Sequence, residues 1–135
     1  MIPLVKTIPM LPMSNNQRER AHWGALKREK DDWTLMIPMC VEANRQRPTE
    51  RRMVEVVFCK RRGPESDPDN LAARCKTILD ALTRRHWIAD DSPAHIDLVV
   101  REDTRAKRSQ TVIAVTECAD EQRPWKEVVY GEDAA

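Results

Sequence analysis

Two different hydrophobic periods meet across one loop of this chain, and together they limit the folds that it can adopt. From Met53 to Cys59 apolar residues alternate and several are β-branched, which is the pattern of a strand. From Leu71 to Leu82 the apolar residues step by three and four, which is the pattern of an amphipathic helix. The stretch Gly63–Pro68 between them holds a glycine and two prolines, so we expect a loop there.

Segments on both sides extend this pattern. Ile2–Met10 is expected to form a first strand, and a long helix is expected over 17–44, broken near Met36 by Pro38. The strand at Met53–Cys59 is expected to be central. The later elements should be a helix from Asn70 to about Arg85, a third strand over 96–100, a charged hairpin loop over 102–109 and a fourth, antiparallel strand over 111–116.

This order of elements predicts one α+β domain over residues 1–118, followed by a C-terminal tail over 119–135 that packs late or stays mobile. The domain should contain a mixed β-sheet of about four strands and two main helices. No run approaches the roughly 18 apolar residues of a membrane span, so we expect no membrane partner and a cytoplasmic protein. The cysteines form no Cys-x-x-Cys pair and are expected to be reduced, mostly buried packing residues: Cys40, Cys59, Cys75 and Cys118.

Charge is nearly balanced overall but unevenly distributed. The 23 basic and 22 acidic residues give a net charge of +1, while basic clusters stand apart from acids gathered at 65–69 and 90–91. A basic surface around an acidic pocket suits a nuclease, because lysine and arginine hold phosphates and carboxylates hold a cation against one of them. The alternative is that each charge run is only a solvated face.

The segment Asp67-Pro68-Asp69 is the most informative acidic pair. Pro68 favours an extended Asp67, so both carboxylates can point to the same side. Such oxygen ligands suit Mg²⁺ or Mn²⁺, ions that keep bound waters and contact phosphate oxygens. The alternative is that these aspartates only cap the helix that follows.

A second acidic pair, Asp90-Asp91, follows the helix, and a return of the chain could bring it beside Asp67. Lys76 lies between the two pairs and could neutralise phosphate charge. The alternative for Lys76 is an exposed helix lysine paired with Asp80 at i+4.

Together these residues resemble the RusA family of Holliday-junction resolvases. The family carries Asp-x-Asp-Asn at a helix start, a lysine four residues before Asp-Ala-Leu, and an Asp-Asp pair after the helix. The matching residues here are Asp67-Pro68-Asp69-Asn70, Lys76 before Asp80-Ala81-Leu82, and Asp90-Asp91. The opening Ser14-Asn15-Asn16 is similar too, and the likeness spans residues 1 to about 118.

The resemblance implies that the metal-binding, catalytic aspartates are Asp67, Asp69 and Asp91, and that the essential lysine is Lys76. Asp90 could replace Asp91 as the ligand. One departure concerns the lysine, because some members place it where this chain has Ala73, so about three residues are inserted here relative to those members. Candidate DNA contacts are Asn15, Asn16, Asn70, Arg61, Arg62, Arg84 and Arg85.

By the same resemblance, the protein is expected to be a bacterial or phage-encoded endonuclease that resolves four-way DNA junctions by paired phosphodiester hydrolysis with Mg²⁺. A near two-fold symmetric substrate that must be cut twice suits a homodimer. Two alternatives remain open, a non-catalytic protein of the same fold that binds branched DNA, and a nuclease acting on forks or flaps.

Overall fold

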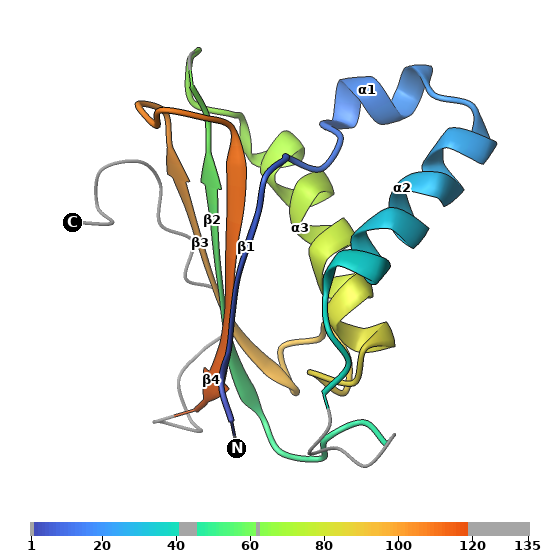
Figure 1. The fold of residues 1–135 in the computed structure, drawn as a ribbon, viewed down its shortest axis with the longest axis vertical. Coiled ribbons are helices and arrows are strands. Elements are labelled where there is room, and N and C mark those ends of the chain that lie inside the picture. Colours follow the sequence, from blue (N-terminus) through green and yellow to red (C-terminus); the bar gives the residue numbers. More distant parts are fainter. Residues whose placement is uncertain (1, 41–45, 62, 119–135) are drawn as a thin grey trace.

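The structure is a computed structural model, and it describes residues 2–40, 46–61 and 63–118. These residues form a four-stranded sheet and three helices, and the helices lie on one face of the sheet (Figure 1). The predicted α+β class, with a single domain and a mixed sheet of four strands, is confirmed. The tail predicted over 119–135, the end of the predicted first helix and Arg62 fall outside the described residues.

The sheet has the order β1-β4-β2-β3, so β2 lies inside it and β3 forms one edge. Its strands are β1 (Leu4–Ile8), β2 (Arg52–Cys59), β3 (Ile96–Asp103) and β4 (Gln110–Glu117). β2 pairs in parallel with β3, whereas β4 runs antiparallel to both of its neighbours, β2 and β1. The central position predicted for β2 is therefore confirmed.

The connection between β3 and β4 corrects the hairpin expected over 102–109. β3 continues to Asp103, and β4 is not its neighbour because β2 lies between them. The chain crosses the end of β2, where the Lys60 N–H donates to the Asp103 carbonyl (2.6 Å) and the Ala106 N–H donates to the Lys60 carbonyl (3.1 Å). The charge and spacing of the sequence indicate that the chain turns back after β3, but contacts across the whole sheet decide which strand β4 pairs with.

The single helix expected over 17–44 is also wrong, because two helices occupy this region. α1 spans Asn15–Arg20 and α2 spans Trp23–Met36, with an extended backbone at the two residues between them. Trp23, where the apolar spacing begins, is 76% exposed, so that part of the pattern marks no buried face. The predicted break near Met36 is confirmed, since Ile37 is extended, as expected for a residue that precedes proline.

α3 (Pro68–Arg84) covers the sheet with the residues that the helical spacing singles out. Its buried side chains pack against the alternating inner face of the sheet and against Trp33 of α2, which is fully buried. The buried apolar residues of α3 are Leu71, Cys75, Ile78, Leu79, Ala81 and Leu82.

The cysteines agree with their predicted role as packing residues. All four are free thiols, three of them are buried, and Cys118 is half-buried. In the described part of the chain no helix has the length and apolar character that crossing a membrane requires.

Candidate functional site

The first candidate residues meet at the start of α3. Asp67 is the helix N-cap, and its Oδ1 accepts a hydrogen bond from the Asn70 backbone N–H at 2.9 Å. Pro68 follows at the first helical position, where its missing N–H costs no hydrogen bond. Asp69 lies in the first turn, where the helix dipole favours a negative charge. Asp67 and Asp69 are both exposed, so their carboxylates remain accessible to a ligand.

Asn70 ties this helix start to α1. Its Oδ1 accepts a hydrogen bond from the Asn15 backbone N–H at 2.9 Å, and its Nδ2 lies 3.4 Å from Asp67 Oδ2. Asn15 and Asn70, both candidate DNA contacts, therefore adjoin the Asp67 end of α3, and Asn16 is exposed on α1 beside them. The cap role proposed as an alternative for Asp67 is present here, and it leaves Asp69 outside the cap.

Lys76 and Asp91 form a second group, further along α3. Lys76 Nζ lies 2.6 Å from Asp91 Oδ2 and 3.1 Å from Asp80 Oδ1. The hydrogen bond from Lys76 lowers the pKa of Asp91, and the same bond raises the pKa of Lys76. Asp90 Oδ1 accepts a hydrogen bond from the Asp91 backbone N–H at 2.8 Å, which shapes the turn. The Lys76 side chain is 60% exposed, so its ammonium group can still meet a phosphate.

The two groups do not converge on one ion. Asp67 and Lys76 are nine residues apart, which on a helix is a rise of roughly 13 Å, whereas an oxygen ligand lies about 2 Å from Mg²⁺. The described ranges contain no group of three or more histidine, cysteine, aspartate or glutamate side chains that could hold a metal ion. The structure therefore keeps Asp67 and Asp69 at one end of α3 and places Asp91 with Lys76.

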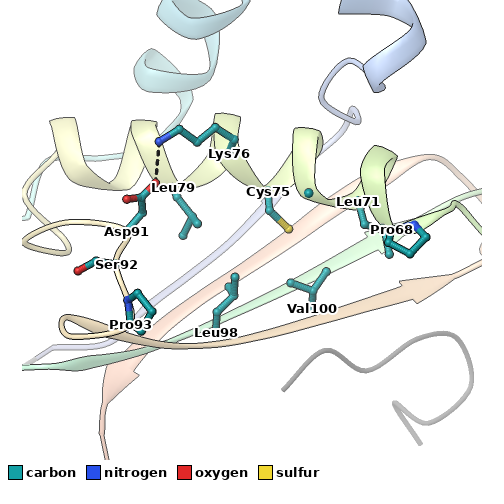
Figure 2. Close-up of a pocket in the computed structure, with 11 residues that line it drawn as sticks. Pro68, Leu71, Cys75, Lys76, Leu79, Asp91, Ser92, Pro93, Leu98 and Val100 are labelled. Carbon is teal, nitrogen blue, oxygen red and sulfur yellow. Dashed lines mark hydrogen bonds and ion pairs between the residues drawn. The ribbon is translucent and has the colours of Figure 1, made fainter. Parts of the chain in front are cut away.

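A groove of about 500 Å³ runs between α3 and β3 and connects these two ends. Figure 2 shows Pro68 at one end of it and Asp91 at the other, with the apolar side chains of the helix facing those of the strand. The side chains that line the groove are mostly apolar, and Lys76 and Asp91 supply charge at its rim. The apolar residues of α3 and β3 that face each other across the groove are Leu71, Cys75, Leu79, Leu98 and Val100.

The candidate arginines do not gather at one place. Arg84 and Arg85 lie at the far end of α3, where the Arg85 Nε donates to the Thr34 carbonyl at 2.7 Å and so ties α3 to α2. Arg84 is exposed, with its Nη1 3.6 Å from Asp31 Oδ1. Arg61 follows β2 and is exposed. Of the candidate arginines that the structure describes, it is the nearest in sequence to Asp67.

Sequence reasoning missed one group beside this site. Glu102 is expected in a loop, but it lies on β3 with its side chain fully buried, and its Oε1 accepts a hydrogen bond from the Ser66 backbone N–H at 2.6 Å. The signal was available, because Glu102 continues the alternation of Leu98 and Val100. Ser66 immediately precedes the Asp67 cap.

Comparison with known proteins adds no relative. A scan against protein-family models finds no family that matches this chain. A search of curated proteins likewise finds no match.

Proposed function

We propose that this protein is a Mg²⁺-dependent endonuclease that cuts branched DNA, with the four-way junction as its preferred substrate. The observation that carries the proposal is the start of α3, where Asp67 and Asp69 expose two carboxylates separated by one proline. The Asp-x-Asp-Asn motif and the Asp-Asp turn after the helix, which resemble those of the RusA family, add the substrate class.

The residues at the start of α3 fit a hydrated divalent ion better than a fully enclosed one. Asp67 uses its Oδ1 in the cap, which leaves lone pairs on both oxygens, and the Asp69 side chain has no hydrogen bond or ion pair with the other described residues. Mg²⁺ commonly binds through one or two carboxylates and keeps several waters for substrate phosphates to replace. When bound, such an ion activates a water and stabilises charge on the cleaved phosphate. Mn²⁺ would suit the same ligands.

Lys76 and Asp91 have a distinct part in this proposal. Asp91 holds the Lys76 ammonium group at the rim of the groove, where it can contact a phosphate of the bound strand. Exposed Arg61 and Arg84 would contact further phosphates without reading bases, which gives salt-dependent binding. Asp90 shapes the turn through its bond to the Asp91 N–H, which leaves lone pairs on both of its oxygens, so Asp90 stays the alternative to Asp91 as a ligand.

The substrate suggests an oligomeric state, and the resemblance suggests a cellular setting. Resolving a junction requires two cuts, so a two-fold homodimer with two such sites matches it. Light scattering at micromolar concentration should then report about twice the 15.6 kDa chain mass, and a mass near 15.6 kDa would count against the dimer. A cytoplasmic protein of a bacterium or phage is the setting that the resemblance suggests.

A second candidate is a non-catalytic protein that binds branched DNA. The observation in its favour is that Asp67 caps α3 and Asp91 pairs with Lys76, so both side chains have structural partners without an ion. This candidate predicts binding that is indifferent to Mg²⁺ and no cleavage by the pure protein.

One experiment separates the two candidates. Purified protein is incubated with an end-labelled synthetic four-way junction, a fork and a flap, with and without Mg²⁺, beside Asp69→Asn and the control Asp32→Asn. Asp32 is an exposed carboxylate on α2, so its substitution makes the same chemical change elsewhere. We expect paired, symmetric nicks in the junction from the wild type and Asp32→Asn only. Binding without cleavage supports the non-catalytic candidate, and preferential cutting of fork or flap reassigns the substrate.

A further inference from the structure

Glu102, a buried carboxylate, contacts the segment that immediately precedes the proposed metal ligands Asp67 and Asp69. Glu102 extends from β3 towards the helices and has no exposed surface. Its neighbours on the same side of the strand, Leu98 and Val100, are apolar and buried, so a carboxylate at this position is unexpected. Burial of a carboxylate costs free energy unless the charge is paired and hydrogen-bonded.

Among the described residues, the Glu102 carboxylate contacts Ser66 and Lys60, in the segment that leads into α3. Its Oε1 accepts the Ser66 backbone N–H at 2.6 Å, and its Oε2 lies 3.6 Å from Lys60 Nζ. Lys60 Nζ itself donates to the Pro64 carbonyl at 2.8 Å and to Ser66 Oγ at 3.1 Å. Arg74 adds a weaker contact from its Nη1 to Ser66 Oγ at 3.4 Å. Ser66 is therefore held through its backbone and its hydroxyl at the same time.

Stability alone is a poor reason to keep this network. Replacing a buried ion pair with apolar residues of similar size is often neutral or stabilising. The Oε2 of Glu102 has no hydrogen bond among the described residues, so its pairing with Lys60 is also incomplete. What the network does provide is a fixed backbone at Ser66, one residue before Asp67 and three before Asp69.

We infer that Glu102, together with Lys60, is a positioning residue for the proposed metal site. By holding Ser66, the pair fixes the direction in which the chain enters α3, and so fixes where the Asp67 and Asp69 carboxylates point. This inference rests on the proposed function, because it requires those two carboxylates to bind an ion. Groups that orient metal ligands from outside the ligand set commonly change metal affinity by about 10-fold to 100-fold when they are removed.

The test measures Mn²⁺ binding by calorimetry, without DNA, for wild type, Glu102→Leu, Glu102→Gln and the control Glu55→Gln. Glu102→Leu removes both contacts, and we expect it to weaken Mn²⁺ binding by about 10-fold. Glu102→Gln keeps an acceptor for the Ser66 N–H and should restore part of that loss. Glu55 lies half-buried on β2, on the opposite face of the sheet, and Glu55→Gln should bind Mn²⁺ like the wild type.

Two readouts separate positioning from a general loss of structure. Amide exchange at Ser66 and Asn70 should accelerate in Glu102→Leu, while exchange in the interior of β2 and the melting temperature stay near those of the wild type. If Glu102→Leu binds Mn²⁺ as tightly as the wild type, or if its loss only follows a lower melting temperature, the inference is overturned. Wild-type protein that binds Mn²⁺ in this Glu102-dependent way but cuts no branched DNA would overturn the proposed nuclease activity and leave the positioning role standing.

Discussion

Asp67 has two roles in this account, and a pair of substitutions should separate them. Its carboxylate caps α3 through a 2.9 Å hydrogen bond from the Asn70 N–H, and it is also a proposed metal ligand. Asparagine caps a helix about as well as aspartate, whereas alanine loses about 1 kcal/mol of stability. For a domain of this size, that loss lowers the melting temperature by about 3 to 5 °C. Asp67→Asn should therefore melt like the wild type, and Asp67→Ala should not.

Cleavage should respond differently from stability. Removing groups that only support metal ligands costs up to about 100-fold, so replacing a ligand with an uncharged amide should cost at least about that much. Both Asp67 variants should therefore lose Mg²⁺-dependent cutting of the labelled junction, although Asp67→Asn stays as stable as the wild type. Thermal melting followed by circular dichroism and the cleavage assay on the same preparations give the comparison. An Asp67→Asn protein that cuts as fast as the wild type would refute the metal role and leave only the cap.

Three further outcomes follow from individual contacts. Lys76 lowers the pKa of Asp91, so the pair stabilises the fold above about pH 4, and this stabilisation is lost as the pH falls through the lowered pKa. In Lys76→Met, NMR titration should find the Asp91 pKa closer to its ordinary value. An unchanged Asp91 pKa would refute the pairing. Burial raises the pKa of the Cys75 thiol to about 12, so iodoacetamide at pH 8 should leave Cys75 unlabelled until the protein unfolds, as mass spectrometry can check. Glu29 is buried and accepts a 2.6 Å bond from Arg18, so Glu29→Ala should cost roughly 2 kcal/mol in urea unfolding, and a loss near zero would contradict this.

The central elements of the fold could be predicted because their hydrophobic periods are unambiguous. The strand at Met53–Cys59 and the helix at Leu71–Leu82 each bury the face that their spacing indicates. The neighbour of β4 could not be predicted, because a strand that alternates apolar residues can pair on either side of β2. The division between α1 and α2 could not be predicted because α1 has no apolar residue whose spacing could mark its end, and the apolar spacing begins only at Trp23, which is exposed.

The parts of the site that neighbouring residues determine could be predicted, whereas those that depend on contacts between segments far apart in the sequence could not. The loop and helix start at Asp67 follow from the proline and the turn residues around it. The position of Asp91 depends on how far the chain returns along α3, and that return brings it to Lys76 rather than to Asp67. Glu102 was misplaced for a different reason, because its charge suggests a loop although its spacing from Leu98 and Val100 continues the buried face of β3.

The proposed activity rests on the claim that a divalent ion binds at the start of α3 through Asp67 and Asp69. The most direct measurement is an NMR titration with substoichiometric Mn²⁺, whose broadening of amide signals falls steeply with distance from the ion. We expect the amide signals of Asp69 and Asn70 to broaden first, well before that of Ser92, and the effect to disappear in Asp69→Asn. Broadening that is centred on the turn at 91–92, or that persists unchanged in Asp69→Asn, would contradict the claim.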